Sequence, residues 1–317
     1  MTDRARENED SETREVIDRA ASGAPAAGWA IRDRFSSDEI FQRLVASADE
    51  EIATGKQELI FSGFAAGFAI VLSFIGYSVG KTYFPHNNFL SSILYPLGFM
   101  YIILGRYQLY TENTLPPVVL VLTRLASVPL LFRVWTVVLI GNVLGAGLGA
   151  FILANTHVLS PATMEAGTTF AKHGLETGWW DVFFKSLFAG WLVAGVVWLG
   201  NAARDTIARL LLIYIVFYTI AVADLFHVIT AVCDVFYFVF VGGGGVRIFY
   251  EFWFPVLLGN TVGGVFLVGL VNFAQVEQHT YPETRVLSSR ELLFSWKGGQ
   301  TNEPSRSAEE ESKPISE

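Results

Sequence analysis

Long apolar stretches recur along this chain, and four of them contain no charged side chain: residues 59–80, 134–156, 186–203 and 252–276. A helix of about 20 apolar residues crosses the roughly 30 Å of hydrocarbon in a bilayer. Each of these windows therefore predicts one uninterrupted transmembrane helix.

Two further stretches are long enough to cross but carry polar residues in their interior. Residues 91–123 include Arg106 and Glu112, and residues 210–241 are interrupted by ionisable side chains, among them His227. We interpret each stretch as two half-helices joined by non-helical backbone. Such backbone is tolerated at membrane depth only where it is buried in protein or lines a cavity. The sequence thus predicts an all-α membrane protein with six crossings, of which the second and fifth are broken.

An internal repeat relates the two halves of this arrangement. Residues 139–151 (LIGNVLGAGLGAF) and 257–269 (LLGNTVGGVFLVG) are near copies, 118 positions apart. This similarity favours a duplication of a three-helix unit. Because three crossings are an odd number, the halves are predicted to be inverted relative to each other, with a transport site between them.

Composition and charge agree with a membrane protein and add its orientation. Of 317 residues, 52% are hydrophobic and 16% charged, with a mean hydropathy of +0.41, more apolar material than a soluble domain of this size buries. The first 57 residues hold eight Lys or Arg, and the loops after the second and fourth crossings are also basic. The positive-inside rule therefore predicts that both termini are cytoplasmic, in a cell membrane (inner or plasma).

The polar ends are predicted to be separate from the bundle. A capping-box pattern at Ser36 and Glu39 precedes apolar residues at helical spacing, which predicts an amphipathic helix. The ends themselves are too polar to fold alone. The predicted organisation is a disordered cytoplasmic tail at 1–35, an amphipathic cytoplasmic helix at 36–57, a six-helix channel domain at 58–277 and a mostly disordered cytoplasmic tail at 278–317.

The first break, residues 105–117 (GRYQLYTENTLPP), suggests a helix that restarts inside the membrane. Thr114 is a candidate cap, and Pro116 and Pro117 fall in the first turn of the new helix. A helix N-terminus favours a small anion. For Arg106 and Glu112, an ion pair that only holds the loop in shape is the alternative to a functional role.

The second break, residues 223–234 (ADLFHVITAVCD), contains the one histidine placed inside a predicted crossing, His227. Asp224 lies three positions before it and Asp234 seven positions after it, a spacing that would put Asp234 and His227 on one face if the local backbone is helical. An imidazole carries a proton or donates a hydrogen bond near neutral pH, so we expect a functional role, with polar contacts between helices as the alternative. Cys233 is the single cysteine, which leaves no disulfide or zinc cluster. No catalytic dyad, metal cluster or phosphate loop stands out, so no enzymatic activity, cofactor or metal is predicted.

Taken together, these motifs resemble the formate/nitrite transporter family. The resemblance rests on Leu109, Tyr110 and Thr111 at the first break, on His227 at the second, and on the Gly-Asn pairs of the third and sixth crossings, and it runs from about residue 37 to residue 275. It implies an aquaporin-like protomer, a homopentamer with one pore per subunit in the lipid bilayer, and passive or proton-coupled passage of small monovalent anions such as formate, nitrite or hydrosulfide. No nucleic-acid partner is expected.

The resemblance also implies roles for individual residues. His227 would be the central pore histidine, Thr111 the threonine facing it, Leu109 a constriction, and Tyr95 and Phe99 gate positions. The predicted substrate pathway comprises His227, Thr111, Leu109, Tyr110, Tyr95, Phe99, Glu112, Asn113, Asp224 and Phe226.

The chain departs from the family pattern at several of these positions. Phe226 replaces an acidic residue, Ala231 replaces a common asparagine, and Glu112 stands where a small polar residue is usual, which indicates a divergent branch. If Glu112 and Asp234 are ionised and line the lumen, a pore for neutral solutes or cations is the alternative. A further alternative is a membrane scaffold or sensor that has lost conduction.

Overall fold

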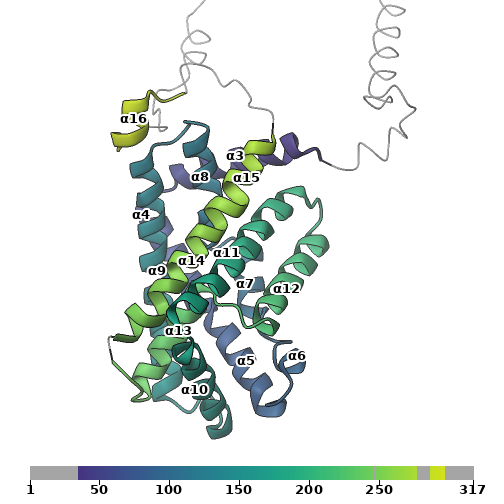
Figure 1. The fold of residues 1–317 in the computed structure, drawn as a ribbon, viewed down its shortest axis with the longest axis vertical. Helices are drawn as coiled ribbons and strands as arrows, with labels where there is room; N and C mark the ends of the chain where they lie inside the picture. Colours follow the sequence, from purple (N-terminus) through teal and green to yellow (C-terminus); the bar gives the residue numbers. More distant parts are fainter. Residues whose placement is uncertain (1–34, 246, 277–285, 297–317) are drawn as a thin grey trace, which may run out of the picture.

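The computed structural model describes residues 35–245, 247–276 and 286–296, and every regular element in these ranges is helical (Figure 1). Four helices are long and apolar enough to cross a membrane: Lys56–Tyr83, Val128–Asn155, Trp179–Ala202 and Phe249–Gln275. They correspond to the first, third, fourth and sixth predicted crossings. The prediction of an all-α membrane fold is confirmed.

The second and fifth crossings are broken, as predicted. The second consists of α7 (Leu97–Leu104), an irregular segment that ends in the 3₁₀ turn η1 (Glu112–Thr114), and α8 (Pro116–Leu122). The fifth consists of α12 (Thr206–Val222), a five-residue break at 223–227, and α13 (Val228–Phe240).

Two details differ from the sequence expectation. The interruption of the fifth crossing ends at residue 227, so Asp234 lies inside the intact helix α13. Thr114 does not cap α8, because its hydroxyl donates to the carbonyl oxygen of Thr111 (2.7 Å) and so satisfies the buried turn η1 instead.

The unbroken crossings differ in regularity. The first bends at Ile70, between α4 (Lys56–Ala69) and α5 (Val71–Tyr83). The third and fourth are the regular helices α9 (Val128–Asn155) and α11 (Trp179–Ala202). The sixth runs through the π-helical η2 (Phe249–Trp253), α14 (Phe254–Val262), the π-helical η3 (Gly263–Leu270) and α15 (Val271–Gln275).

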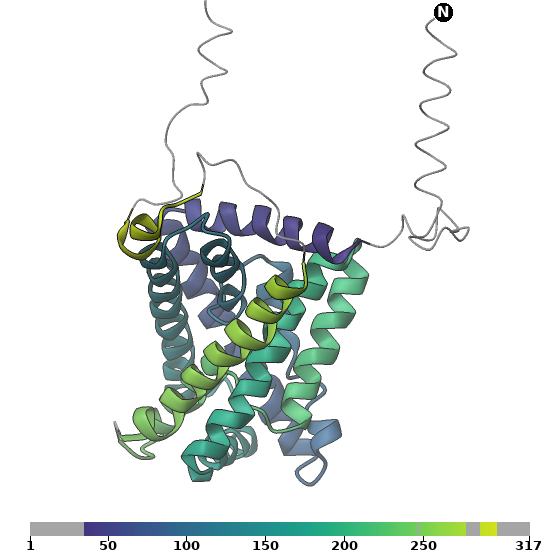
Figure 2. The same cartoon turned by 45° about the horizontal axis from the view of Figure 1, so that its top comes forward.

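Helices also cover both ends of the bundle. The purple helix α3 (Ser37–Ala53) lies across one end in Figure 2, and its N-terminus has the predicted capping box of Ser36 and Glu39. At the opposite end lie α6 (Asn88–Ser91) and α10 (Pro161–Glu176) (Figure 1).

Sequence reasoning did not identify α10 or the short α16 (Ser289–Phe294) on the α3 side. The helix α10 is amphipathic and packs through Phe170 on Phe74 and Tyr77 of α5, so it has no transmembrane signature. The predicted tail at 1–35 lies outside the described residues except for residue 35, and most of the tail at 278–317 also lies outside them.

The repeat is visible in the backbone of the two breaks. Arg106 and Asp224 are 118 positions apart, and both have left-handed backbone, with φ of 58° and 55°. In each case the next residue donates its N–H to a carbonyl five positions back, at 3.0 and 2.9 Å. This is the Schellman ending of a helix, so α7 and α12 end in the same way.

Two buried asparagines bind the breaks to their neighbours. The Oδ1 atom of Asn142 accepts the N–H of Tyr110 (2.9 Å), and its Nδ2 donates to the carbonyls of Gly63 (2.7 Å) and Gln108 (2.9 Å). One amide therefore joins the first, second and third crossings.

Asn260 repeats this pattern in the second half. Its Oδ1 accepts the N–H of Val228 (2.8 Å), and its Nδ2 donates to the carbonyls of Ser186 (2.7 Å) and Phe226 (2.9 Å). Both asparagines are fully buried, at 0% exposure. The Gly-Asn pairs thus serve the backbone rather than a ligand.

Glycines allow the helices to approach closely enough for these bonds. Gly67 lies against the backbone of Asn142, and Gly190 lies against the backbone of Asn260, without space for a β-carbon. Small residues at such crossings are typical of membrane helix pairs.

Replacing Asn142 with alanine would leave a buried N–H and a buried carbonyl of the first break without their partner. We expect Asn142→Ala to lower the free energy of unfolding by about 2 to 4 kcal/mol. The measurement is the thermal-unfolding midpoint of purified protein in detergent. Asn155→Ala is the control, because exposed Asn155 bonds only to a carbonyl of its own helix. Equal midpoints for the two variants would contradict this role of Asn142.

Candidate functional site

His227 lies where the fifth crossing restarts, directly before α13. Its Nδ1 accepts the N–H of Ile229 (3.3 Å), and its Nε2 lies 2.7 Å from Oγ1 of Thr111 in the first break. The side chain is buried, with 1% exposure. The two breaks therefore meet at this pair of side chains.

The hydrogen bonds assign the tautomer of the ring. Because Nδ1 accepts a backbone N–H, a neutral imidazole carries its proton on Nε2 and donates it to Thr111. The hydroxyl proton of Thr111 is then available for another acceptor. A protonated ring would place a second N–H against the N–H of Ile229.

Aromatic and aliphatic side chains close the α3 side of this pair. The ring of Phe99 contacts His227 edge-on, with centroids 4.8 Å apart, and stacks on Phe217 at 3.6 Å. Leu109 is also fully buried beside them. These side chains form an apolar constriction.

On the other side of His227 is a small cavity, here called the central chamber. It has a volume of about 20 Å³, and His227, Thr230, Asp234 and Tyr95 are among its lining residues. The Tyr95 hydroxyl donates to Thr230 (3.3 Å), whose hydroxyl donates to the carbonyl of His227 (2.9 Å). Such a volume holds about one water molecule.

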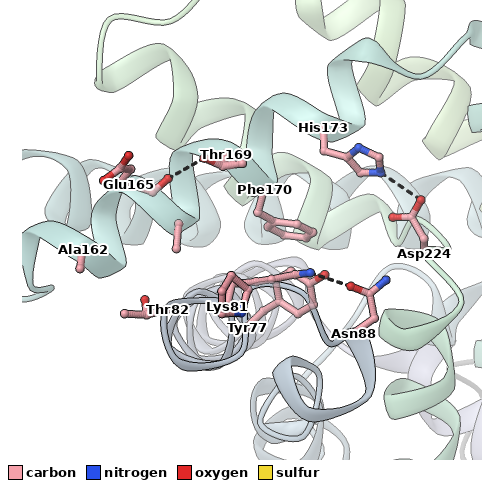
Figure 3. A pocket seen from close by; sticks show the side chains of 12 residues that line it. Tyr77, Lys81, Thr82, Asn88, Ala162, Glu165, Thr169, Phe170, His173 and Asp224 are labelled. Carbon is pink, nitrogen blue, oxygen red and sulfur yellow. Dashed lines mark hydrogen bonds and ion pairs between the residues drawn. The ribbon is translucent and has the colours of Figure 1, made fainter.

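The chamber adjoins a larger cavity, the α10-side vestibule, of about 640 Å³ (Figure 3). Tyr77, Phe170 and Asp224 line both spaces. Lys81 and Asn88, joined at 2.6 Å, also line the vestibule. Together the two cavities lead from the α10 end of the bundle to His227.

Asp224 is at the junction of vestibule and chamber and has two cationic or basic neighbours. Its Oδ2 lies 2.5 Å from Nζ of Lys185 and 3.1 Å from Nε2 of His173 (Figure 3 shows the His173 contact). Lys185 also lies over the ring of Phe226, 5.3 Å from its centroid. The negative charge of Asp224 is therefore balanced by Lys185.

A second large cavity, the α3-side vestibule, reaches the constriction from the other end. It has a volume of about 720 Å³, and Leu109 forms part of its wall. Its charged lining residues are Glu50, Glu51, Glu58, Arg106, Glu112 and Arg209. The two vestibules thus approach the His227–Thr111 pair from opposite ends.

Arg106 and Glu112 do not form an ion pair within 4.0 Å, although both belong to the described residues. Arg106 interacts instead with Glu51 of α3. Burial raises the pKa of Glu51 to about 8, and the positive charge of Arg106 limits this increase. The Oε2 atom of Glu51 is buried without a hydrogen-bond partner.

Most of the predicted pathway residues gather around these spaces. His227, Tyr95, Asp224 and Phe226 line the central chamber, and Leu109, Glu112 and Asn113 line the α3-side vestibule, while Thr111 and Phe99 lie between them. Tyr110 is different. Its hydroxyl bonds to Thr261 (2.9 Å) and its ring packs on Trp135, so it lines none of the three spaces. The aromatic residue of this motif therefore joins helices.

The anion site expected at the N-terminus of a half-helix is not formed. Helix α8 has seven residues and begins with Pro116 and Pro117, which have no N–H to donate. In α13, the N–H of Val228 bonds to Asn260 and that of Ile229 to His227. The protein itself uses these donors.

Several residues of the site were not found by sequence reasoning: Tyr77, Thr230 and His173, which line the cavities, and Lys185 and Phe217, which contact Asp224 and Phe99. Apart from Lys185 these are ordinary helix residues in the sequence, and nothing local indicates which way they face. Lys185, directly before the window at 186–203, was the one available signal. Within the described ranges, no cluster of three His, Cys, Asp or Glu side chains is placed to hold a metal ion.

The model of the formate/nitrite transporter family matches residues 38–274. The chain belongs to the formate/nitrite transporter family. Inner membrane protein YfdC of Escherichia coli (strain K12) is 28% identical over 276 residues, which cover 85% of this chain and 86% of that protein. The formate channel FocA of Haemophilus influenzae is 24% identical over 151 residues, 45% of this chain and 53% of that one.

Solved structures of formate/nitrite transporter proteins share the fold. A pentameric formate channel with formate bound aligns with a TM-score of 0.58 at 20% identity and covers 69% of this chain and 96% of that chain. An FNT family ion channel aligns with a TM-score of 0.66 at 16% identity, covering 75% and 99%. The protein is therefore a membrane protein of a family of channels and transporters.

Glu51 allows a test of the α3-side geometry by pH. Its carboxyl binds its proton up to about pH 8 in the folded protein, against 4.5 ordinarily. Folding therefore loses stability as pH rises from 4.5 to about 8, because the unfolded carboxyl ionises first. We expect Glu51→Gln to melt at a higher temperature than the wild type at pH 8 and above, and at the same temperature near pH 4.

The control for this experiment is Glu58→Gln, since Glu58 lines the same vestibule but is exposed. It should follow the wild-type pH profile of thermal unfolding. A Glu51→Gln profile parallel to that of the wild type would show that Glu51 ionises normally.

Proposed function

We propose that this protein conducts small monovalent anions, such as formate or nitrite, across the cell membrane. The path runs from the α3-side vestibule past Leu109, Thr111 and His227 into the central chamber and the α10-side vestibule. The observation that carries the proposal is the hydrogen bond of 2.7 Å between Thr111 and His227, placed where two broken helices meet between two large cavities.

The chemistry of the pair suits an anion. A bare anion that enters a narrow apolar slit loses its hydration at high cost, unless donors replace the lost water. The Nε2–H of His227 and the hydroxyl of Thr111 are such donors. A hydrogen bond or a proton from them lowers the barrier at the point where the path is narrowest.

The constriction is closed in this structure, so conduction requires side-chain motion. Phe99 and Phe217 are both fully buried and stacked on each other. A rotation of Phe99 would connect the α3-side vestibule with His227. Rotamer changes of this kind are fast compared with backbone rearrangement.

We further propose that α3 lies on the cytoplasmic side and that the protein is a homopentamer. The orientation follows from the basic residues on the α3 side. An apolar strip on α9 that includes Ile140, Leu144 and Phe151 is exposed in the single chain and suits lipid or a neighbouring subunit. A structural relative is a pentameric formate channel.

A pore for neutral solutes or cations is the second candidate. It is favoured by the acidic residues Glu50, Glu58 and Glu112 of the α3-side vestibule, besides Glu51, whose raised pKa keeps it largely protonated at neutral pH. Ionised carboxylates at a pore entrance attract cations and repel anions. Uptake of formate, nitrite, acetate, glycerol and a monovalent cation by liposomes containing the purified protein distinguishes the two candidates.

His227→Ala is the direct test of the pore histidine. Removing the donor at the narrowest point should lower formate flux by at least about tenfold. This factor corresponds to a barrier raised by roughly the free energy of one charge-assisted hydrogen bond. The measurement is radiolabelled formate uptake into liposomes. His86→Ala is the control, because His86 is exposed in the turn after α5. Unchanged flux in His227→Ala would remove the histidine from the mechanism.

Glu112→Gln tests whether the α3-side vestibule carries a charge that opposes anions. If Glu112 is ionised at neutral pH, the amide should increase formate uptake, because it removes a negative charge from the path. The same liposome assay at neutral pH gives the answer, with Glu176→Gln as the reference, because Glu176 is exposed on α10 and lines none of the three cavities. A decrease in uptake would indicate that the carboxyl group itself assists passage.

A further inference from the structure

Asp234 is a buried acid without a counter-ion. It lies in the middle of α13, is 6% exposed, and lines the central chamber together with His227. Its Oδ1 atom is buried and has no hydrogen-bond partner. Within the described ranges, no Lys, Arg or His nitrogen lies within 4.0 Å of its carboxyl group.

Among the described residues, no Lys or Arg side chain lines the central chamber beside this carboxyl, and Lys81 lies in the vestibule, bonded to Asn88. Asp224 of the preceding break is paired with Lys185 and His173, and Arg247 is paired with Glu251 of η2. The remaining ionisable groups around the chamber and its vestibule are Tyr77 and Lys81 of α5, Tyr95 before α7, Glu165 of α10, and Cys233 of α13 itself. The part of α9 that packs on α13 has no charged residue.

An isolated carboxylate in such surroundings is costly. A buried charge without a partner loses several kcal/mol of hydration, and the group takes up a proton instead. The neutral carboxylic acid then has an O–H group that can donate a hydrogen bond. Enzymes use a carboxylic acid kept neutral by an apolar site in this way.

We propose that Asp234, as an uncharged carboxylic acid, donates a hydrogen bond to the anion in the central chamber and so determines specificity on the α10 side of His227. This inference rests on the proposed anion transport. It explains how an acidic residue lines an anion path. The chamber then offers donors on two sides, the Asp234 carboxyl and the pair of His227 and Thr111.

The proposal gives a pH dependence with a definite sign. Raising the pH on the α10 side ionises Asp234, which removes the donor and adds a negative charge that repels the anion. Formate flux in the wild type should therefore fall as this pH is raised from neutral into the alkaline range. Asp234→Asn keeps the shape and an N–H donor but does not ionise, so its flux should stay within about twofold over the same range.

Asp234→Leu removes the donor and should lower formate flux at neutral pH by about tenfold. Glu165→Gln is the matched control, because Glu165 is a carboxylate of the same vestibule outside the chamber. It should keep the wild-type pH profile. If Asp234→Leu fails to fold, as judged by size-exclusion chromatography, the pH profile of formate flux in Asp234→Asn tests the proposal instead.

A second measurement does not depend on transport. The infrared spectrum of the wild type should contain the C=O stretching band of a protonated carboxylic acid that is absent from Asp234→Asn at the same pH. Its absence from the wild type at neutral pH would overturn the proposal, as would an alkaline fall of flux in Asp234→Asn equal to that of the wild type. Lack of formate transport by the wild type at every pH would instead overturn the proposed function, and the donor role of Asp234 with it.

Discussion

Backbone groups that a broken membrane helix leaves unpaired must find partners inside the protein, since the bilayer offers none. Asn142 and Asn260 supply them. Each asparagine accepts one N–H from a break and donates to a carbonyl of that break and to a carbonyl of a neighbouring crossing. The position of His227 depends on this bonding, because Asn260 holds the residues on both sides of it. The chemistry of the site therefore requires that the backbone of the breaks is stable.

Duplication has copied the backbone of the breaks while their side chains have diverged. His227 is 118 positions after Leu109, the same spacing that separates the two asparagines. One break thus presents an imidazole and the other an aliphatic constriction at equivalent places. Arg106 and Asp224 are the second residues of the two breaks, and they have opposite charge and the same left-handed conformation. The two halves thus share the same backbone arrangement, while the side chains along the proposed path differ between them.

Acidic residues along this path are neutralised in different ways. Asp224 has Lys185 as an ion partner and His173 as a hydrogen-bond partner, in a partly exposed junction. Glu51 lies near Arg106, and burial raises its pKa to about 8. Asp234 has no ion partner and is only 6% exposed, and for that reason its uncharged form fits the chamber. The number of carboxyl groups near a pore is therefore a poor guide to its charge.

The sequence alone determined the six crossings, the two breaks, the inverted repeat and the location of His227 within the second break. These features can be recognised from the sequence, because a polar residue within a long apolar window is costly in a bilayer and its position is therefore evident in the hydropathy pattern. Only the tertiary structure decided that Tyr110 turns away from the path, that Lys185 pairs with Asp224, and that α10 covers one end. Such contacts join residues far apart in the chain. The direction of a side chain follows from the packing of several helices, which spacing along one helix does not specify.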